Sequence, residues 1–182
     1  MNLIQLQDFF ADYSISSIIM AVFIYLAVYF IDKHTKSKVV KGLTYFLPFA
    51  LGLITNFVYN LILHKKVVFN SQLLSAGLMT GCLSLVIKVI INRVLKGEKL
   101  PDSKLALLIS GLIEGQVEKE RVIEVANLIE KITLETGEIK TECEIICEIE
   151  IVLSKHALKS VTEQQIKALA TLIFASVNQT KE

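Results

Sequence analysis

Two cysteines and a histidine in the second half of the chain are the residue types best suited to bind a metal. Cys143 and Cys147 stand four residues apart, and His156 follows on what we expect to be the same helix. A tetrahedral metal site needs further ligands, and the sequence contains no Cys-x-x-Cys motif and no second cysteine pair. We therefore predict that both cysteines are buried as small apolar side chains, and that the chain holds no metal and no other cofactor.

Glutamates in the same segment are a second candidate for chemistry, because paired carboxylates can act as acid and base or bind a cation. They spread over both faces of the expected helix, which is typical of a solvated surface. The residues are Glu142, Glu144, Glu148 and Glu150. The sequence also lacks a Walker motif, a dinucleotide fingerprint, GxSxG and HExxH. We predict no catalytic residue and no enzymatic activity.

Polar and small residues inside two apolar segments carry the strongest functional signal. They recur at steps of three or four residues, so each set shares one face of a helix. They are Gly52, Asn56 and Asn60 in segment 43–63, and Gly77, Gly81, Ser84 and Lys88 in segment 67–91. Small residues allow a second helix to approach closely, and an asparagine in lipid needs a polar partner. These seven residues are the candidate site.

Two interpretations of these faces stay open. They could pack helices within one chain, or they could form a seam between copies of the chain that lines a pore. Three spans offer few helices to bury two polar faces, so we favour a homo-oligomeric seam. Lys88 lies near the end of its segment, and we favour snorkelling of its ammonium to the interface over pore lining.

The elements that would position these residues are long apolar helices. The chain is 53% hydrophobic with a mean hydropathy of +0.56. Segments 14–31, 43–63 and 67–91 each have the length that crosses a bilayer, and they are apolar on nearly every face. We predict an all-α membrane protein with three transmembrane helices, the second of them kinked at Pro48.

Charges beside the apolar segments predict their orientation. Segment 32–42 carries four lysines, and Arg93, Lys96 and Lys99 follow the third segment, whereas the first 13 residues carry acids only. Two lysines in the link 64–66 are the one conflict. By the positive-inside rule we predict a multi-pass protein of the cell membrane, with the N-terminus outside and the C-terminal half in the cytoplasm.

The second half of the chain has a different character. Residues 98–182 carry more acids than bases, which argues against a nucleic-acid partner. Helical periodicity predicts a four-helix domain with helices near 103–114, 117–132, 138–156 and 162–177. Asp102 is the expected N-cap of the first helix, and capping boxes begin at Thr141 and Thr162. We place the transmembrane domain at 1–97 and the cytoplasmic domain at 98–182.

A faint repeat of 22 residues runs through this second half. It aligns Val117 with Ile139 and Val161, and it predicts buried columns formed by Val125, Cys147 and Leu169 and by Ile129, Ile151 and Ile173. Gly115 and Gly137 would end two of the helices. The turns EGQVEKE and TGEIKTE resemble turns of TerB-like helical domains of tellurite-resistance proteins. Those families tend to have Asp before the glycine, where this chain has Glu114 and Thr136, and that departure argues against an acidic metal site.

Together these patterns predict a homo-oligomeric membrane effector or channel-like protein, in contact with the lipid bilayer. Its cytoplasmic helical domain would sense a ligand or a protein partner. Small bacterial effectors that depolarise the membrane, in antiviral defence for example, share this layout. The alternative is a membrane-anchored adaptor or scaffold that docks a cytoplasmic protein. A phage holin ranks lower, because most holins lack a structured domain of this size.

Overall fold

The computed structural model describes residues 3–34, 46–64, 71–101, 103–135 and 141–179, and this part of the chain is helical with no β-strand. It divides into two compact units, Leu3–Ile91 and the residues from Asn92 onward. The division falls within one helix, α5, so the two units share an unbroken helical backbone. The lysines expected to orient the first loop lie mostly outside the described residues.

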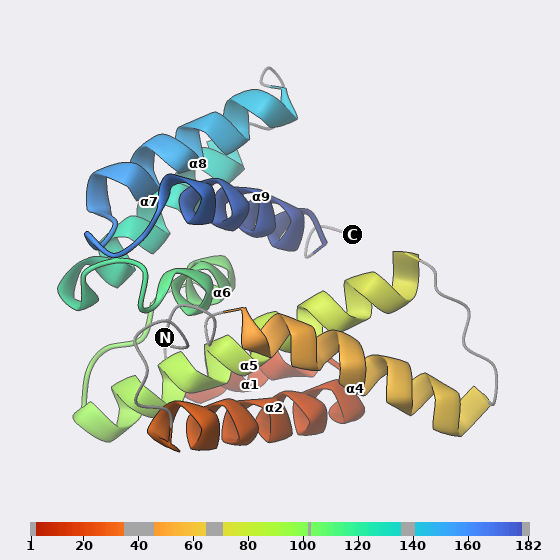
Figure 1. The fold of residues 1–182 in the computed structure, drawn as a ribbon. Helices are drawn as coiled ribbons and strands as arrows, with labels where there is room; N and C mark the ends of the chain where they lie inside the picture. The colour runs from red at the N-terminus through yellow and green to blue at the C-terminus, as the bar shows by residue number, and fades with distance from the viewer. Residues whose placement is uncertain (1–2, 35–45, 65–70, 102, 136–140, 180–182) are drawn as a thin grey trace. The chain divides into compact units, whose positions relative to one another are not determined.

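The first unit contains α1 (Leu3–Ala11), α2 (Ile15–His34), α4 (Leu47–His64) and most of α5 (Ser71–Lys96). The prediction missed α1, whose Phe9 is buried with its ring centroid 5.3 Å from that of Tyr13, the two rings being tilted by 51°. Helix α2 packs against α4, and α4 runs antiparallel to α5 (Figure 1).

Two described helices, α2 and α5, are long and apolar enough to cross a membrane, so the prediction of three such helices is wrong. The apolar stretch of α4 covers only Leu47–Ile62. Pro48 explains the later start, because it occupies the first turn of α4, where a helix needs no amide donor. The predicted kink at Pro48 is therefore also wrong. Segment 43–45 lies outside the described residues.

Most of α2 is exposed although it is apolar. Only 17% of its most apolar stretch is buried, mainly at Ala21, Ile24 and Val28, which form one stripe of the helix. Large side chains on its other faces, including Phe23 and Phe30, are exposed. A core helix of a water-soluble unit would be mostly buried, so this pattern is compatible with a helix that lipid surrounds.

The second unit contains the predicted four α-helices and one short 3-10 turn. They are α6 (Lys104–Ile113), η1 (Lys119–Arg121), α7 (Val122–Glu135), α8 (Glu142–His156) and α9 (Glu163–Gln179). Every residue of α6 from Ala106 to Ile113 is buried. Helix α6 packs on α7 and α9, and α8 packs on the same two helices, as Figure 1 shows. Helix α6 is thus apolar and buried along most of its length.

Side-chain caps fix where these helices begin. Ser103 caps α6, since the amide of Ala106 donates to its Oγ over 2.9 Å, and the expected cap Asp102 lies outside the described residues. Both predicted capping boxes are confirmed, at Thr141 before α8 and at Thr162 before α9. Capping satisfies amides that a helix start leaves without an intrahelical partner.

The turn at the end of α6 also agrees with the sequence. Gly115 has a φ of +87°, in the left-handed region that a C-terminal glycine favours. Val117 then makes backbone bridges to Glu114 and to Ala157, which ties this turn to the end of α8. Gly137 and Ile139, the equivalents in the proposed repeat, lie outside the described residues.

Helix α8 contradicts the predicted columns. Cys143 and Cys147 are exposed rather than buried, and Ile151 is 67% exposed. The buried stripe of α8 is instead Ile145, Ile149 and Leu153. These positions lie two residues along, which is about 200° around a helix, so the 22-residue repeat has the wrong phase in this helix. The prediction failed because Ile alternates with Glu in this segment, so the sequence offers two possible apolar stripes and does not show which one is buried.

Replacement of Ile149 by Ala should destabilise the second unit by about 2–5 kcal/mol, because it deletes a fully buried side chain. The matched control Ile151→Ala, on the exposed face of the same helix, should change stability by less than about 0.5 kcal/mol. Denaturant unfolding of the full chain in detergent, followed by circular dichroism, measures both. Equal losses in the two variants would show that the assigned face of α8 is wrong.

Candidate functional site

The predicted site residues meet at the contact between α4 and α5, where the two backbones touch. A Cβ atom on Gly52 would collide with the carbonyl oxygen of Gly77 and lie 3.0 Å from the amide nitrogen of Gly81. A Cβ atom on Gly77 would lie 2.8 Å from the Cα of Leu53. Only glycine fits at these points, so Gly77 and Gly81 act as the small-residue motif that the sequence indicated.

The contact continues at the other end of the motif. A Cβ atom on Gly81 would lie 2.9 Å from the Cα of Phe49 and 3.0 Å from the carbonyl oxygen of Pro48. The two helices are antiparallel, because Phe49 lies at Gly81 and the later residue Leu53 lies at the earlier residue Gly77. Pro48 thus contributes to the helix contact although it does not kink α4.

Asn56 is the polar centre of this contact and is 5% exposed. Its Nδ2 donates to the carbonyl oxygen of Gly52 and to Oγ1 of Thr80, each over 3.0 Å, and approaches the carbonyl oxygen of Ala76 at 3.5 Å. Thr80, which the sequence interpretation did not select, in turn donates to Ala76 over 2.7 Å. A threonine one residue before Gly81 on the same helix was the signal that could have found it.

The remaining site residues differ in how far they are buried. Ser84 is buried and donates to the carbonyl oxygen of Gly81 over 2.7 Å. Asn60 and Lys88 are half-buried, and the amide of Asn60 donates to the carbonyl oxygen of Asn56 over 2.9 Å. The structure therefore brings the two predicted faces together within one chain, which is the first of the two interpretations. A seam between copies of the chain stays a prediction.

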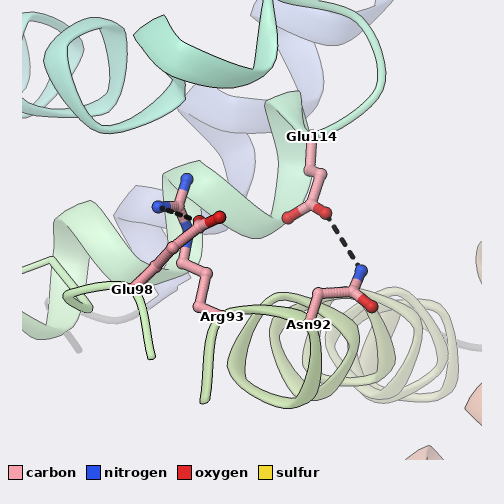
Figure 2. Close-up of polar contacts among 4 residues, drawn as sticks. All are labelled: Asn92, Arg93, Glu98 and Glu114. Carbon is pink, nitrogen blue, oxygen red and sulfur yellow. Dashed lines mark hydrogen bonds and ion pairs between the residues drawn. The ribbon is translucent and has the colours of Figure 1, made fainter. Parts of the chain in front are cut away.

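A second group of polar residues, at the end of α5, was not predicted as a site. Figure 2 shows Asn92 and Arg93 of α5 beside Glu98 and Glu114. Nδ2 of Asn92 donates to Oε1 of Glu114 over 3.2 Å, and Nη1 of Arg93 lies 3.4 Å from Oε2 of Glu98. We call these four residues the α5 joint. All four belong to the second unit, so the joint attaches the last turns of α5 to that unit.

The chemistry available to these residues is packing and hydrogen bonding. Among the described residues, no three His, Cys, Asp or Glu side chains lie close enough together to hold a metal ion. His156 contacts Arg121, with its Nδ1 3.3 Å from Nη1 of the arginine.

Comparison with protein-family models, with curated proteins and with solved structures finds no match for this chain. The resemblance of its two turns to TerB-like domains therefore stays a prediction. Function has to be inferred from the α4–α5 contact and the α5 joint.

Replacement of Gly52 by Ala should destabilise the first unit by about 1–3 kcal/mol, because the added methyl group meets the backbone of α5. Ala50→Val, which enlarges an exposed side chain on the same helix, is the control and should change stability much less. Thermal unfolding in detergent measures the difference. A neutral Gly52→Ala variant would contradict the close backbone approach.

The pairing of Asn56 with Thr80 predicts a measurable coupling free energy. In a double-mutant cycle of Asn56→Ala and Thr80→Ala, we expect about 0.6 kcal/mol, and at most roughly 1.7, the range known for hydrogen bonds between membrane helices. A cycle of Asn56 with Ser84, which donates within its own helix, should give a coupling near zero. Additive effects for the first pair would disprove the hydrogen bond.

Proposed function

We propose that the chain is a membrane effector in which the C-terminal helical unit controls the membrane helices through α5. The continuity of α5 carries this proposal. It is an apolar helix of 26 residues, and its last turns from Asn92 onward belong to the second unit. The α5 joint binds those turns by side-chain contacts. A change in the packing of the second unit would therefore reach α5 without passing through a flexible linker.

The exposed apolar surface of the first unit supports lipid as its partner. Large apolar side chains are exposed along both α2 and α4, and in water a contiguous apolar surface of this kind is unfavourable. They include Ile15, Phe23, Phe30, Ile54, Leu61 and Ile62. The basic residues at and after the end of α5, Arg93, Lys96 and Lys99, favour a cytoplasmic location for the second unit.

Asn60 and Lys88 are the strongest candidates for a contact between copies of the chain. The glycines, Asn56 and Ser84 are used within one chain, whereas these two side chains are only half-buried. A lysine and an asparagine beside lipid gain by facing another helix or water. We propose a homo-oligomer in which they line an ion path, so that opening depolarises the membrane, as in bacterial antiviral effectors. For Lys88 this proposal replaces the snorkelling that its place in the sequence favoured.

Induced expression should collapse the membrane potential and arrest growth if this function is correct. Lys88→Met and Asn60→Leu should each reduce the depolarisation strongly, because they remove the polar groups of the ion path. Ile54→Leu, on an exposed apolar position of α4, should leave it unchanged. A voltage-sensitive dye reports the potential, and ion flux into vesicles containing only the purified chain checks that the effect is direct. An absence of flux in both assays would contradict the proposal.

An adaptor is the second candidate function, and the exposed face of α8 favours it. Cys143, Cys147 and Ile151 are all exposed and share one face at steps of four residues. An apolar helical stripe of this kind suits an amphipathic partner helix. Replacement of residues 1–91 by unrelated membrane helices separates the two functions, because an adaptor keeps its activity and a channel loses it.

A further inference from the structure

The α5 joint contains a buried arginine whose hydrogen bonding is incomplete. Arg93 is 8% exposed, yet its contact with Glu98 is a single one of 3.4 Å. Charge-assisted hydrogen bonds of a guanidinium are normally 2.7–2.9 Å and often bidentate. Its Nε is buried and has no hydrogen-bond partner among the described residues. The Glu98 side chain is 44% exposed, so this carboxylate stays largely hydrated.

Glu114 has an unpaired acceptor, which complements the unpaired donor of Arg93. Its Oε1 accepts from Asn92, whereas its Oε2 is buried without a hydrogen-bond partner in the described part of the chain. In Figure 2 the second oxygen of Glu114 points to the side on which Arg93 and Glu98 lie. A buried donor on α5 and a buried acceptor at the end of α6 are thus left unpaired in the same cluster, and each carries a desolvation cost.

The backbone is hydrogen-bonded on both sides of the α5 joint, and the amide of Glu98 donates to the carbonyl oxygen of Arg93 over 2.9 Å. The amide of Glu114 donates to the carbonyl oxygen of Ser110 over 3.0 Å, and Val117 bridges the following turn to the end of α8. Arg93 lies at the last turn of α5, beyond which the chain reverses at Gly97 with a φ of +68°. The turn after Glu114 is thus also tied to α8, whereas the described residues at the end of α5 make no such bridge, so we take the end of α5 as the partner that moves.

We propose that Arg93 exchanges carboxylate partners, and that this exchange turns the end of α5. In the arrangement described above, Arg93 pairs with Glu98 while Asn92 holds Glu114. In the second arrangement, Nε and a terminal nitrogen of Arg93 donate together to Glu114, Asn92 is displaced, and Glu98 is released to water. Both unpaired buried atoms are then satisfied, and the release of a half-exposed carboxylate costs little.

The exchange has a defined direction of movement. Asn92 and Arg93 are consecutive residues, about 100° apart around the helix axis. To replace Asn92 by Arg93 at the carboxylate of Glu114, the last turn of α5 must rotate. As a regulatory device this rests on the proposed function, since rotation of α5 is the signal that would reach the membrane helices. The exchange itself can be tested without any activity.

Arginine NMR offers a direct test, because Arg93 and Arg121 are the only arginines in the chain. In the full-length protein with nitrogen-15-labelled arginine in detergent, each gives one Nε–H signal, and Arg121→Lys assigns them. Glu98→Gln removes the competing carboxylate, so the Arg93 Nε–H should exchange with solvent about tenfold more slowly, the factor that one net hydrogen bond supplies. Asn92→Ala, which frees Glu114, should slow it similarly.

Three further variants exclude simpler explanations. Glu98→Gln combined with Glu114→Gln should remove the slowing. Lys96→Met and Glu118→Gln change a nearby charge without removing either carboxylate partner of Arg93, and they should leave the signal unchanged. Unchanged exchange in both Glu98→Gln and Asn92→Ala would overturn the proposal, as would a slowing that survives loss of Glu114.

The activity of the same variants then separates this inference from the proposed function. Under the exchange, Glu98→Gln and Glu114→Gln favour opposite arrangements, so they should shift membrane depolarisation in opposite directions. If the NMR signals respond as expected and depolarisation does not, the exchange stands and the proposed effector function fails.

Discussion

The fold of the first unit depends on the direct contact between the backbones of α4 and α5. At Gly52, Gly77 and Gly81 no side chain separates the two helices, and any larger residue would overlap backbone atoms. This closeness is what brings the amide of Asn56 within 3.0 Å of Thr80. In an apolar environment the contact and the hydrogen bond support each other, because dispersion between backbones replaces the hydrophobic effect and the amide has few other partners.

The glycines and Asn56 make their contacts within one chain, so α4 and α5 pack together as a close pair. This contact also determines which faces of the two helices point away from it. Apolar side chains of α2 and α4 are left exposed, and Asn60 and Lys88 are polar residues of the pair that are only half-buried. Fewer polar groups of α4 and α5 therefore reach the surface than the sequence alone suggested, and the proposed contact between copies would involve these few groups.

Local patterns in the sequence were sufficient for most of the helices, but not for long-range pairs. Capping boxes at Thr141 and Thr162 and the glycine at position 115 fixed helix ends, because these signals involve residues only a few positions apart. Faces were less certain: in α8 the spacing Cys143, Cys147, Ile151 competed with Ile145, Ile149, Leu153, and only packing decides between them. The pairing of Asn92 with Glu114 has no signal in spacing, since the two residues are 22 positions apart and the whole of α6 lies between them.

The two ends of α5 are held by interactions of different stiffness, and this difference determines where α5 can respond. Near its start, backbone meets backbone at Gly77 and Gly81, so any shift produces overlap and no side chain can yield. Near its end, Arg93, Asn92 and two carboxylates hold it by long side chains whose hydrogen bonds can be exchanged. A buried polar network that is only partly satisfied is costly, so a rearrangement that pairs its remaining groups is favoured. We therefore expect movement of α5 to begin at residues 92–98 and to stop where Gly77 and Gly81 pack against the backbone of α4.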